Sequence, residues 1–321
     1  MTQAPLFTDP SCYHAAFATV LRATDPTADP FQVLGGNAAT AARLGEDGLL
    51  RFSDPLEPLT AVFARHRYDL VQHPVHGPEQ WREAAEALRS GRTVAVAADA
   101  FHLEHYWVGH RTSHALHVVV LQDYDPADRS VRLLDPGEVV FFDGRVPLGS
   151  LEPAMCSADV GQAWMELTSR HDQYPDDPAA TAGLLAEGLA GTGTAPDWIS
   201  GTALVHALSL RLDTYLDLVG NRPRGGAGGQ IDWGVGQWLP LGLWWYHHTL
   251  RWLGIHLGSG TVEQASRDLL VVRNLMMRLG VMNPESLRAS TFRSQLATRL
   301  DSAGEHLAAA GRTLSEQGAA R

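Results

Sequence analysis

Three consecutive segments between residues 117 and 143 have the length and alternation of β-strands, and this run constrains the fold more than any other feature. The strands are predicted at residues 117–125, 130–135 and 138–143, with a Pro-Ala-Asp turn between the first two. A further short strand is predicted at residues 93–99. Because consecutive strands joined by short turns pair antiparallel, this part of the chain must build an antiparallel sheet.

Helices are predicted before the strands. In the helix at residues 11–23, Phe17, Val20 and Leu21 recur at the helical spacing. Two more helices are predicted at residues 58–66 and 79–89. Helices on one stretch of chain and antiparallel strands on the next predict an α+β fold for the first half.

The second half of the chain has a different pattern. Residues 169–181 are polar and rich in Asp and Pro, which predicts a linker. Beyond them we find no convincing strand, and helices are predicted at residues 198–219, 233–257, 262–279 and 284–314. The predicted domains are therefore an α+β domain at residues 1–168 and an all-α helical domain at residues 182–321.

Composition excludes several classes of function. The chain of 321 residues has a formal net charge of −11 and no basic tract, which argues against nucleic-acid binding. It contains no lysine, which rules out a Schiff-base lysine and a P-loop lysine. No signal peptide is predicted, and the apolar stretch at residues 239–257 carries three histidines and an arginine, which favours a buried helix over a membrane span. We therefore expect a soluble, cytoplasmic protein.

One cysteine, one histidine and one aspartate are placed for nucleophilic catalysis. Cys12 opens the first helix, where unpaired N–H groups and the helix dipole make a thiol easier to ionise. His117 opens an apolar strand and can face that thiol, while Asp135 ends the next strand and can orient the ring through its Nδ1–H. This is the nucleophile, base and orienting group of cysteine acyl transfer.

Alternatives exist for each of the three residues. Cys12 can be a small buried residue, His117 a core histidine, and Asp135 a turn residue before proline. The competing base is His114, and the weaker candidates for the orienting group are Asp123 and Asp125. The other cysteine, Cys156, has no histidine and strand beside it and is predicted to be structural.

A histidine-rich stretch lies just before His117. Its histidines surround Glu104, at His102, His105, His110 and His114. Their spacing matches no familiar metal motif, so we expect a substrate-facing loop and no metal. Tyr106 and Trp107 can line an acyl pocket there. The predicted substrate-binding residues are His102, Tyr106, Trp107 and His114.

Four blocks of sequence resemble the family of the N-terminal domain of butirosin biosynthesis protein H, a branch of the papain-like cysteine fold close to the bacteriocin leader peptidases. The first is Cys12 at a helix start, and the second is the turn Leu34-Gly35-Gly36. The third is the run at residues 94–103, which is similar to the family's run of a strand, an aspartate, two aromatics and a leucine. The fourth and most specific is the run at residues 114–120 with the later Asp-Tyr-Asp and Leu-Asp-Pro.

The resemblance implies an acyltransferase. In this family an acyl or aminoacyl group passes from the phosphopantetheine thioester of a carrier protein to an amine, here matched by Cys12 as nucleophile, His117 as base and Asp135 as orienting carboxylate. It implies no metal and no other cofactor. The expected partners are an acyl or peptidyl carrier protein and a small-molecule amine or hydroxyl acceptor, in natural-product and antibiotic biosynthesis. The helical domain is expected to cover the active site, and whether the chain forms a homodimer is left open.

One departure from the family's peptidase relatives affects the choice of reaction. Those enzymes place a glutamine a few residues before the cysteine to bind the oxyanion, whereas the nearest upstream glutamine here is Gln3. A papain-like peptidase, amidase or thioesterase is the alternative function. A third hypothesis is a non-catalytic scaffold, for which Cys12→Ala would have no effect.

Overall fold

The computed structural model forms two compact units. It describes residues 12–35, 41–44, 50–53, 59–137, 141–170, 177–190, 198–220, 239–279 and 282–319. The first unit, here called the mixed domain, comprises Met1–Pro30 and Leu59–Pro175. The second, here called the helical domain, comprises Phe31–Pro58 and Asp176–Arg321. Residues 31–58, which the sequence analysis placed in the first domain, therefore group with the second.

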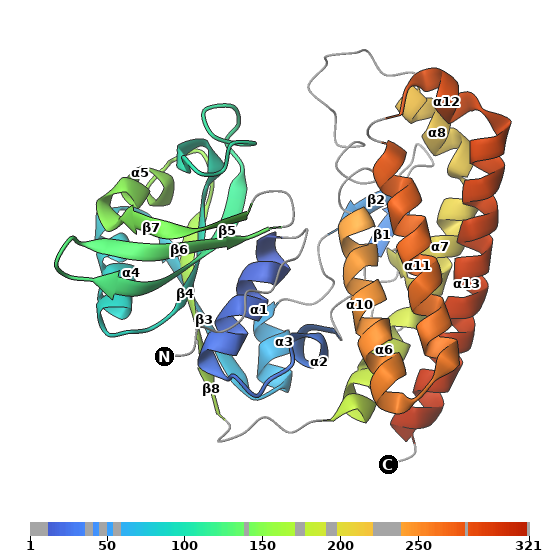
Figure 1. Cartoon of the computed structure of the whole chain (residues 1–321), viewed down its shortest axis with the longest axis horizontal. Coiled ribbons are helices and arrows are strands. Elements are labelled where there is room, and N and C mark those ends of the chain that lie inside the picture. Colours follow the sequence, from blue (N-terminus) through green and yellow to red (C-terminus); the bar gives the residue numbers. More distant parts are fainter. Residues whose placement is uncertain are drawn as a thin grey trace. The chain divides into compact units, whose positions relative to one another are not determined.

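The mixed domain is built on a six-stranded antiparallel sheet (Figure 1). Its strands follow the order β3-β8-β4-β5-β6-β7. Their bounds are β3 Tyr68–Val75, β4 Val94–Asp99, β5 Leu116–Asp125, β6 Ser130–Pro136, β7 Phe141–Pro147 and β8 Gln162–Ser169. The helices of this domain are α1 Cys12–Thr24, α3 Leu59–Arg65, α4 Pro78–Arg89 and α5 Glu152–Met155, with short 3-10 turns η2 Ala100–His102 and η3 Leu148–Leu151.

The central strand β4 requires cover on both faces of the sheet, because all six of its residues are buried. Val94, Val96 and Ala98 pack with α4 and α5 in one apolar cluster that also includes Val119 of β5 and Trp164 of β8. α1 packs along β4, β5, β6 and β8. Its seven consecutive buried residues, 15–21, make it a helix enclosed on all sides. The predicted mixture of helices and antiparallel strands is confirmed.

The helical domain is dominated by long helices that pack side by side (Figure 1). The bounds are α2 Pro30–Leu34, α6 Pro178–Ala190, α7 Gly201–Leu210, α8 Leu212–Gly220, α10 Leu239–Leu257, α11 Gly260–Leu279, α12 Pro284–Arg288 and α13 Ser290–Ala319. α11 packs against both α10 and α13, and α13 packs against α6 and α7. Among the described helices, none combines the length and apolar character needed to cross a membrane.

The prediction that this domain is purely helical was wrong, because it contains a three-stranded antiparallel sheet. The strands are β1 Ala41–Leu44, β2 Leu50–Ser53 and β9 Trp198–Ser200, in the order β2-β1-β9. β9 falls where a helix was predicted. The helix cannot extend backward through Gly201, whose φ is +56° and where a Cβ would lie 2.5 Å from the carbonyl oxygen of Leu189.

Side chains from the helices hold the 31–58 segment in this domain. The indole of Trp245 in α10 donates to the carbonyl of Leu34 at 3.3 Å. The hydroxyl of Tyr215 in α8 accepts from the N–H of Leu50 and donates to its carbonyl oxygen. These bonds explain why a segment early in the chain belongs to the later domain.

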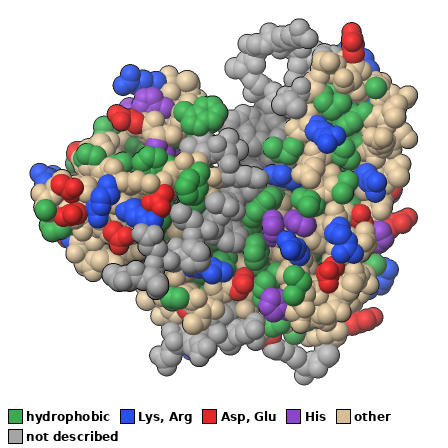
Figure 2. All heavy atoms as spheres, viewed as in Figure 1, with side chains coloured by type: hydrophobic (Ala, Val, Ile, Leu, Met, Phe, Trp, Pro, Cys, Tyr) green, Lys and Arg blue, Asp and Glu red, His purple; other side chains and the backbone are tan. Residues whose placement is uncertain are grey.

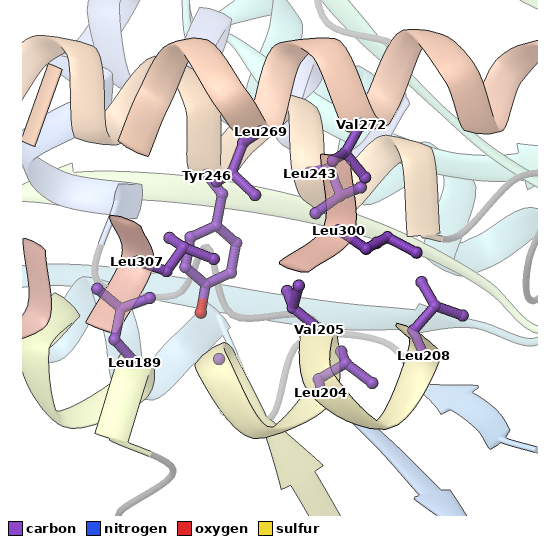
Figure 3. A pocket seen from close by; sticks show the side chains of 11 residues that line it. Leu189, Leu204, Val205, Leu208, Leu243, Tyr246, Leu269, Val272, Leu300 and Leu307 are labelled. Atoms are coloured by element: carbon purple, nitrogen blue, oxygen red, sulfur yellow. The ribbon is translucent and has the colours of Figure 1, made fainter. Parts of the chain in front are cut away.

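A small apolar cavity lies between the helices of this domain (Figure 3). The space open to the centre of a water molecule is about 20 Å³, roughly one water. Its lining is aliphatic except for Tyr246, whose hydroxyl is buried without a hydrogen-bond partner among the described residues. Burial raises the pKa of Tyr246, so the hydroxyl stays protonated.

Candidate active site

The register of β5 and β6 brings His117 and Asp135 to the same face of the sheet. Val120 pairs with Leu134, so continuing the antiparallel ladder by one residue places Asp135 opposite Val119. Val119 and His117 are two residues apart, and side chains two apart on a strand share a face. His117 and Asp135 are therefore diagonal neighbours on one face.

The two side chains form a buried hydrogen bond. His117 Nε2 lies 2.7 Å from Asp135 Oδ2, and the two residues are 5% and 0% exposed. From the sequence, Asp135 was expected to hold the Nδ1–H of the ring, and this expectation was wrong. The ring meets the carboxylate through Nε2, which leaves Nδ1 as the nitrogen that can face the thiol.

Cys12 stands at the first position of α1, where backbone N–H groups have no partner within the helix. The residue is partly exposed, and its thiol forms a hydrogen bond with His117. The structure thus brings together the three residues that the sequence analysis singled out, in the chain Asp135–His117–Cys12.

The electrostatics of this chain favour a charged imidazole. Burial disfavours the cationic ring, but the hydrogen bonds to Asp135 and Cys12 favour it more strongly and raise the pKa of His117 to about 10. Burial also opposes charge on Asp135, whereas its hydrogen bonds with His105 and His117 hold the pKa of Asp135 below its usual value. At neutral pH this pair is an imidazolium facing a carboxylate.

Two further residues, His105 and Tyr106, hold the pair in place from the segment between β4 and β5. His105 Nε2 lies 3.1 Å from the same oxygen of Asp135. The ring of Tyr106 stacks on His117 with 3.9 Å between centroids and 29° between planes. Burial raises the pKa of Tyr106, and the nearby charges of Cys12 and Asp135 raise it further. This role of His105 was not predicted from the sequence, because a loop has no period from which the direction of a side chain follows.

The other predicted substrate-binding residues lie apart from this chain of hydrogen bonds. Trp107 is 68% exposed. His114 Nδ1 lies 2.7 Å from Asp99 Oδ2, and His102 Nε2 lies 4.0 Å from the same oxygen. The competing base His114 therefore has its own carboxylate, Asp99, which the sequence analysis did not name as a site residue.

The alternative orienting groups bind elsewhere. Asp123 Oδ2 lies 3.8 Å from Arg132, and Asp125 accepts the N–H of Ala127. Cys156 packs against the core cluster, and burial raises the pKa of its thiol. Gln3, the upstream glutamine, lies outside the described residues, as does Gly36 of the Leu34-Gly35-Gly36 turn.

This geometry defines an α+β domain in which a cysteine at a helix N-terminus meets a histidine held by a buried carboxylate, the arrangement that activates cysteine nucleophiles. Residues 11–136 match the family described as butirosin biosynthesis protein H, N-terminal. The resemblance seen in the sequence is thereby confirmed. The family is one of antibiotic biosynthesis. A comparison with curated proteins gives no match.

Proposed function

We propose that the chain is a cysteine-dependent acyltransferase that moves an acyl group from a carrier-protein thioester to an amine, in a natural-product pathway. The observation that carries the proposal is the hydrogen-bonded chain Asp135–His117–Cys12 at the start of α1. The family match over residues 11–136 supports a biosynthetic role for it. By the same resemblance, we propose that the mixed domain has the papain-like fold.

In the first step the Cys12 thiolate attacks the thioester carbonyl. The bond between the acyl carbon and the phosphopantetheine sulfur breaks, and His117, which is cationic at neutral pH, protonates the departing thiolate. The products are an acyl-Cys12 thioester and a free pantetheine thiol. Backbone N–H groups at the start of α1 are placed to stabilise the oxyanion.

In the second step an amine attacks acyl-Cys12. His117, now neutral, takes the proton that the amine loses, and the regenerated Cys12 thiolate leaves beside the imidazolium. Asp135 remains a carboxylate throughout and holds Nε2–H, so that Nδ1 stays directed at the sulfur. Both half-reactions begin from a thioester, so the chemistry starts from an activated acyl group.

The proposed donor partner is an acyl or peptidyl carrier protein, which is usually acidic. The proposed docking surface is formed by the arginines that the sequence places on the last helices, at Arg267, Arg273, Arg278, Arg288, Arg293 and Arg299. That surface is less positive than the sequence suggests. Arg293 Nη1 lies 3.0 Å from Asp213 and its Nη2 also pairs with Asp217, while Arg267 lies 3.7 Å from Glu263. Exposed pairs such as these neutralise part of the local field. The covering of the active site by the helical domain stays a prediction.

Trapping the acyl-enzyme tests the proposal. We would incubate the full chain with acyl thioesters of N-acetylcysteamine, which mimic the end of phosphopantetheine, and follow intact mass with and without added amines. One acyl group is expected on Cys12, in wild type and in Cys156→Ala, and none in Cys12→Ala. Amines are expected to accelerate loss of the adduct with formation of the amide.

The same experiment separates the competing functions. Loss of the adduct at one rate with or without amine, with free acid as product, would favour the thioesterase or amidase. Cleavage of peptides in a Cys12-dependent reaction would favour the peptidase. Absence of any adduct on folded wild-type protein, whichever thioester is supplied, would leave the scaffold hypothesis.

A further inference from the structure

A cluster of side chains of the kinds that ligate metals lies at the ends of the segment between β4 and β5. Asp99 ends β4, His102 belongs to η2, and His114 precedes β5. One ligand atom from each, the Oδ2 of Asp99 with a ring nitrogen of each histidine, lies within 4.8 Å of the other two. The active-site chemistry described above uses none of these three residues.

The donor set matches a borderline divalent transition metal. Two imidazoles and one carboxylate are typical ligands of Zn²⁺, which accepts nitrogen and oxygen donors at about 2.0–2.2 Å. The carboxylate of Asp99 is fully buried, whereas the side chains of His102 and His114 are 33% and 38% exposed. A buried carboxylate therefore lies at the base of the cluster, and two imidazoles at its rim are open to a cation from solution. Figure 2 shows histidine side chains at the surface of the mixed domain.

Neighbouring groups hold the ligands in this arrangement. The N–H of Phe101 donates to Asp99 Oδ1 at 3.0 Å, which directs Oδ2 toward the histidines. The Phe101 ring stacks on His114 with 4.3 Å between centroids and 14° between planes. The Ser157 hydroxyl donates to Asp99 Oδ2 at 2.7 Å, and a bound cation would displace it. Such outer contacts are the kind that fix ligands before a metal binds.

A fourth ligand is within reach. Asp159 Oδ2 lies 3.5 Å from His114 Nδ1, on a side chain that is 58% exposed. A small movement would bring this Asp159 oxygen in as the fourth ligand of a tetrahedral site, and a water molecule can serve as that ligand instead. The cluster thus supplies three positioned ligands and one adaptable one.

The cluster and the candidate active site are joined by the segment between β4 and β5. The three ligands lie at the two ends of the segment between β4 and β5, and the middle of that segment carries His105 and Tyr106 to Asp135 and His117. Backbone bonds already join its ends, with the N–H of Ala100 donating to the carbonyl of Ala115. A cation held by both ends would fix the segment further.

We propose that Asp99, His102 and His114 bind one divalent transition-metal cation of the Zn²⁺ class, and that this cation has a structural role in ordering the segment between β4 and β5. The proposal concerns these three side chains and does not depend on the reaction proposed above. The ion stabilises the segment that supports His117 and takes no part in the chemistry at Cys12.

Calorimetric titration with Zn²⁺ tests the proposal. The protein is the full chain carrying Cys12→Ala, stripped of metal with a chelator, because a reactive thiol beside histidines can itself bind zinc. We expect one equivalent of Zn²⁺ to bind and to raise the melting temperature. His102→Ala and His114→Ala are each expected to weaken binding at least tenfold, with His76→Ala, an exposed histidine of the same domain, as the matched control.

Several outcomes would overturn the proposal. One is undiminished one-to-one binding in the double variant His102→Ala, His114→Ala, and another is the absence of binding by the folded parent at micromolar Zn²⁺. Far-UV circular dichroism of each metal-free variant shows that it is folded. Where a variant does not fold, the visible absorption of Co²⁺ bound to the Cys12→Ala parent shows whether the site exists. Bands of tetrahedral coordination support the site, whereas bands of hexahydrated Co²⁺ contradict it.

Discussion

At the residue scale, the arrangement at His117 depends on which ring nitrogen meets which partner. Nε2 is held by Asp135 at 2.7 Å, and the stacked ring of Tyr106 covers one face of the imidazole. The ring cannot turn without breaking the hydrogen bond and the stacking together. Nδ1 is thereby kept available for the sulfur of Cys12.

The raised pKa of His117 gives the first prediction. Its cationic form is favoured by Asp135 and Cys12 and opposed by burial. Replacing Asp135 with Asn removes the largest favourable contribution and leaves the burial and the contacts with Cys12, so the pKa of His117 is expected to fall from about 10. Titration of the His117 ring signals by NMR measures this shift. An unchanged pKa in Asp135→Asn would show that the carboxylate does not control the ring.

The same substitution, Asp135→Asn, should also lower the rate of acyl transfer. In Asp135→Asn the pKa of His117 falls and the tautomer of its ring is no longer fixed, so acyl transfer is expected to fall by about 10²- to 10⁴-fold. The matched control is Asp125→Asn, which changes a carboxylate bonded to a turn N–H on the neighbouring stretch of chain. Initial rates with a thioester donor compare the two. Equal rates in wild type and Asp135→Asn would refute the orienting role.

At the element scale, two buried tyrosines in the helical domain should respond oppositely to loss of the hydroxyl. The hydroxyl of Tyr246 in α10 is without a partner among the described residues, so Tyr246→Phe is expected to be neutral or to raise the free energy of unfolding by about 1–3 kcal/mol. In α8, Tyr215→Phe removes the hydroxyl that bonds both the N–H and the carbonyl of Leu50, and it should lower the free energy of unfolding by about 1–3 kcal/mol.

Urea unfolding of the two variants beside wild type makes that comparison. Both substitutions remove one oxygen from a buried ring, so they differ only in what the hydroxyl touches. A large loss of stability in Tyr246→Phe would show that a bound water in the cavity satisfies the hydroxyl.

The helices and strands also show how much of this fold can be predicted from the sequence. Long helices and the strands β4, β5 and β6 were predicted near their observed bounds. The helices carry long apolar patterns, and the strands are short apolar runs with polar or turn residues at their ends. The three-residue strand β9 was taken as helix, since three residues carry no period and the positive φ of Gly201 is not visible in the sequence. His117 and Asp135 were found because strand register brings them together. Asp99 and His105 were missed, because they meet their partners through a loop.

At the scale of the whole molecule, the helical domain is discontinuous in sequence. Its small sheet needs β1 and β2 from the 31–58 segment, and Tyr215 and Trp245 both bond to that segment. A fragment of residues 176–321 alone should therefore melt at a lower temperature and less cooperatively than one with residues 31–58 fused through a flexible linker. Thermal melts followed by circular dichroism compare them. Identical melts would mean that the segment contributes nothing to the domain.

The proposed acyl transfer depends on the pairing of Cys12 with His117, and alkylation by iodoacetamide across a pH series tests that pairing most directly. In wild type we expect Cys12 to react rapidly at mildly acidic pH, well below the ordinary thiol pKa of about 8.5, while Cys156 does not. His117→Ala should abolish the fast reaction at acidic pH. If Cys12 reacts like an ordinary thiol in wild type, or reacts equally in both proteins, the pairing with His117 and the acyl-transfer chemistry built on it are wrong.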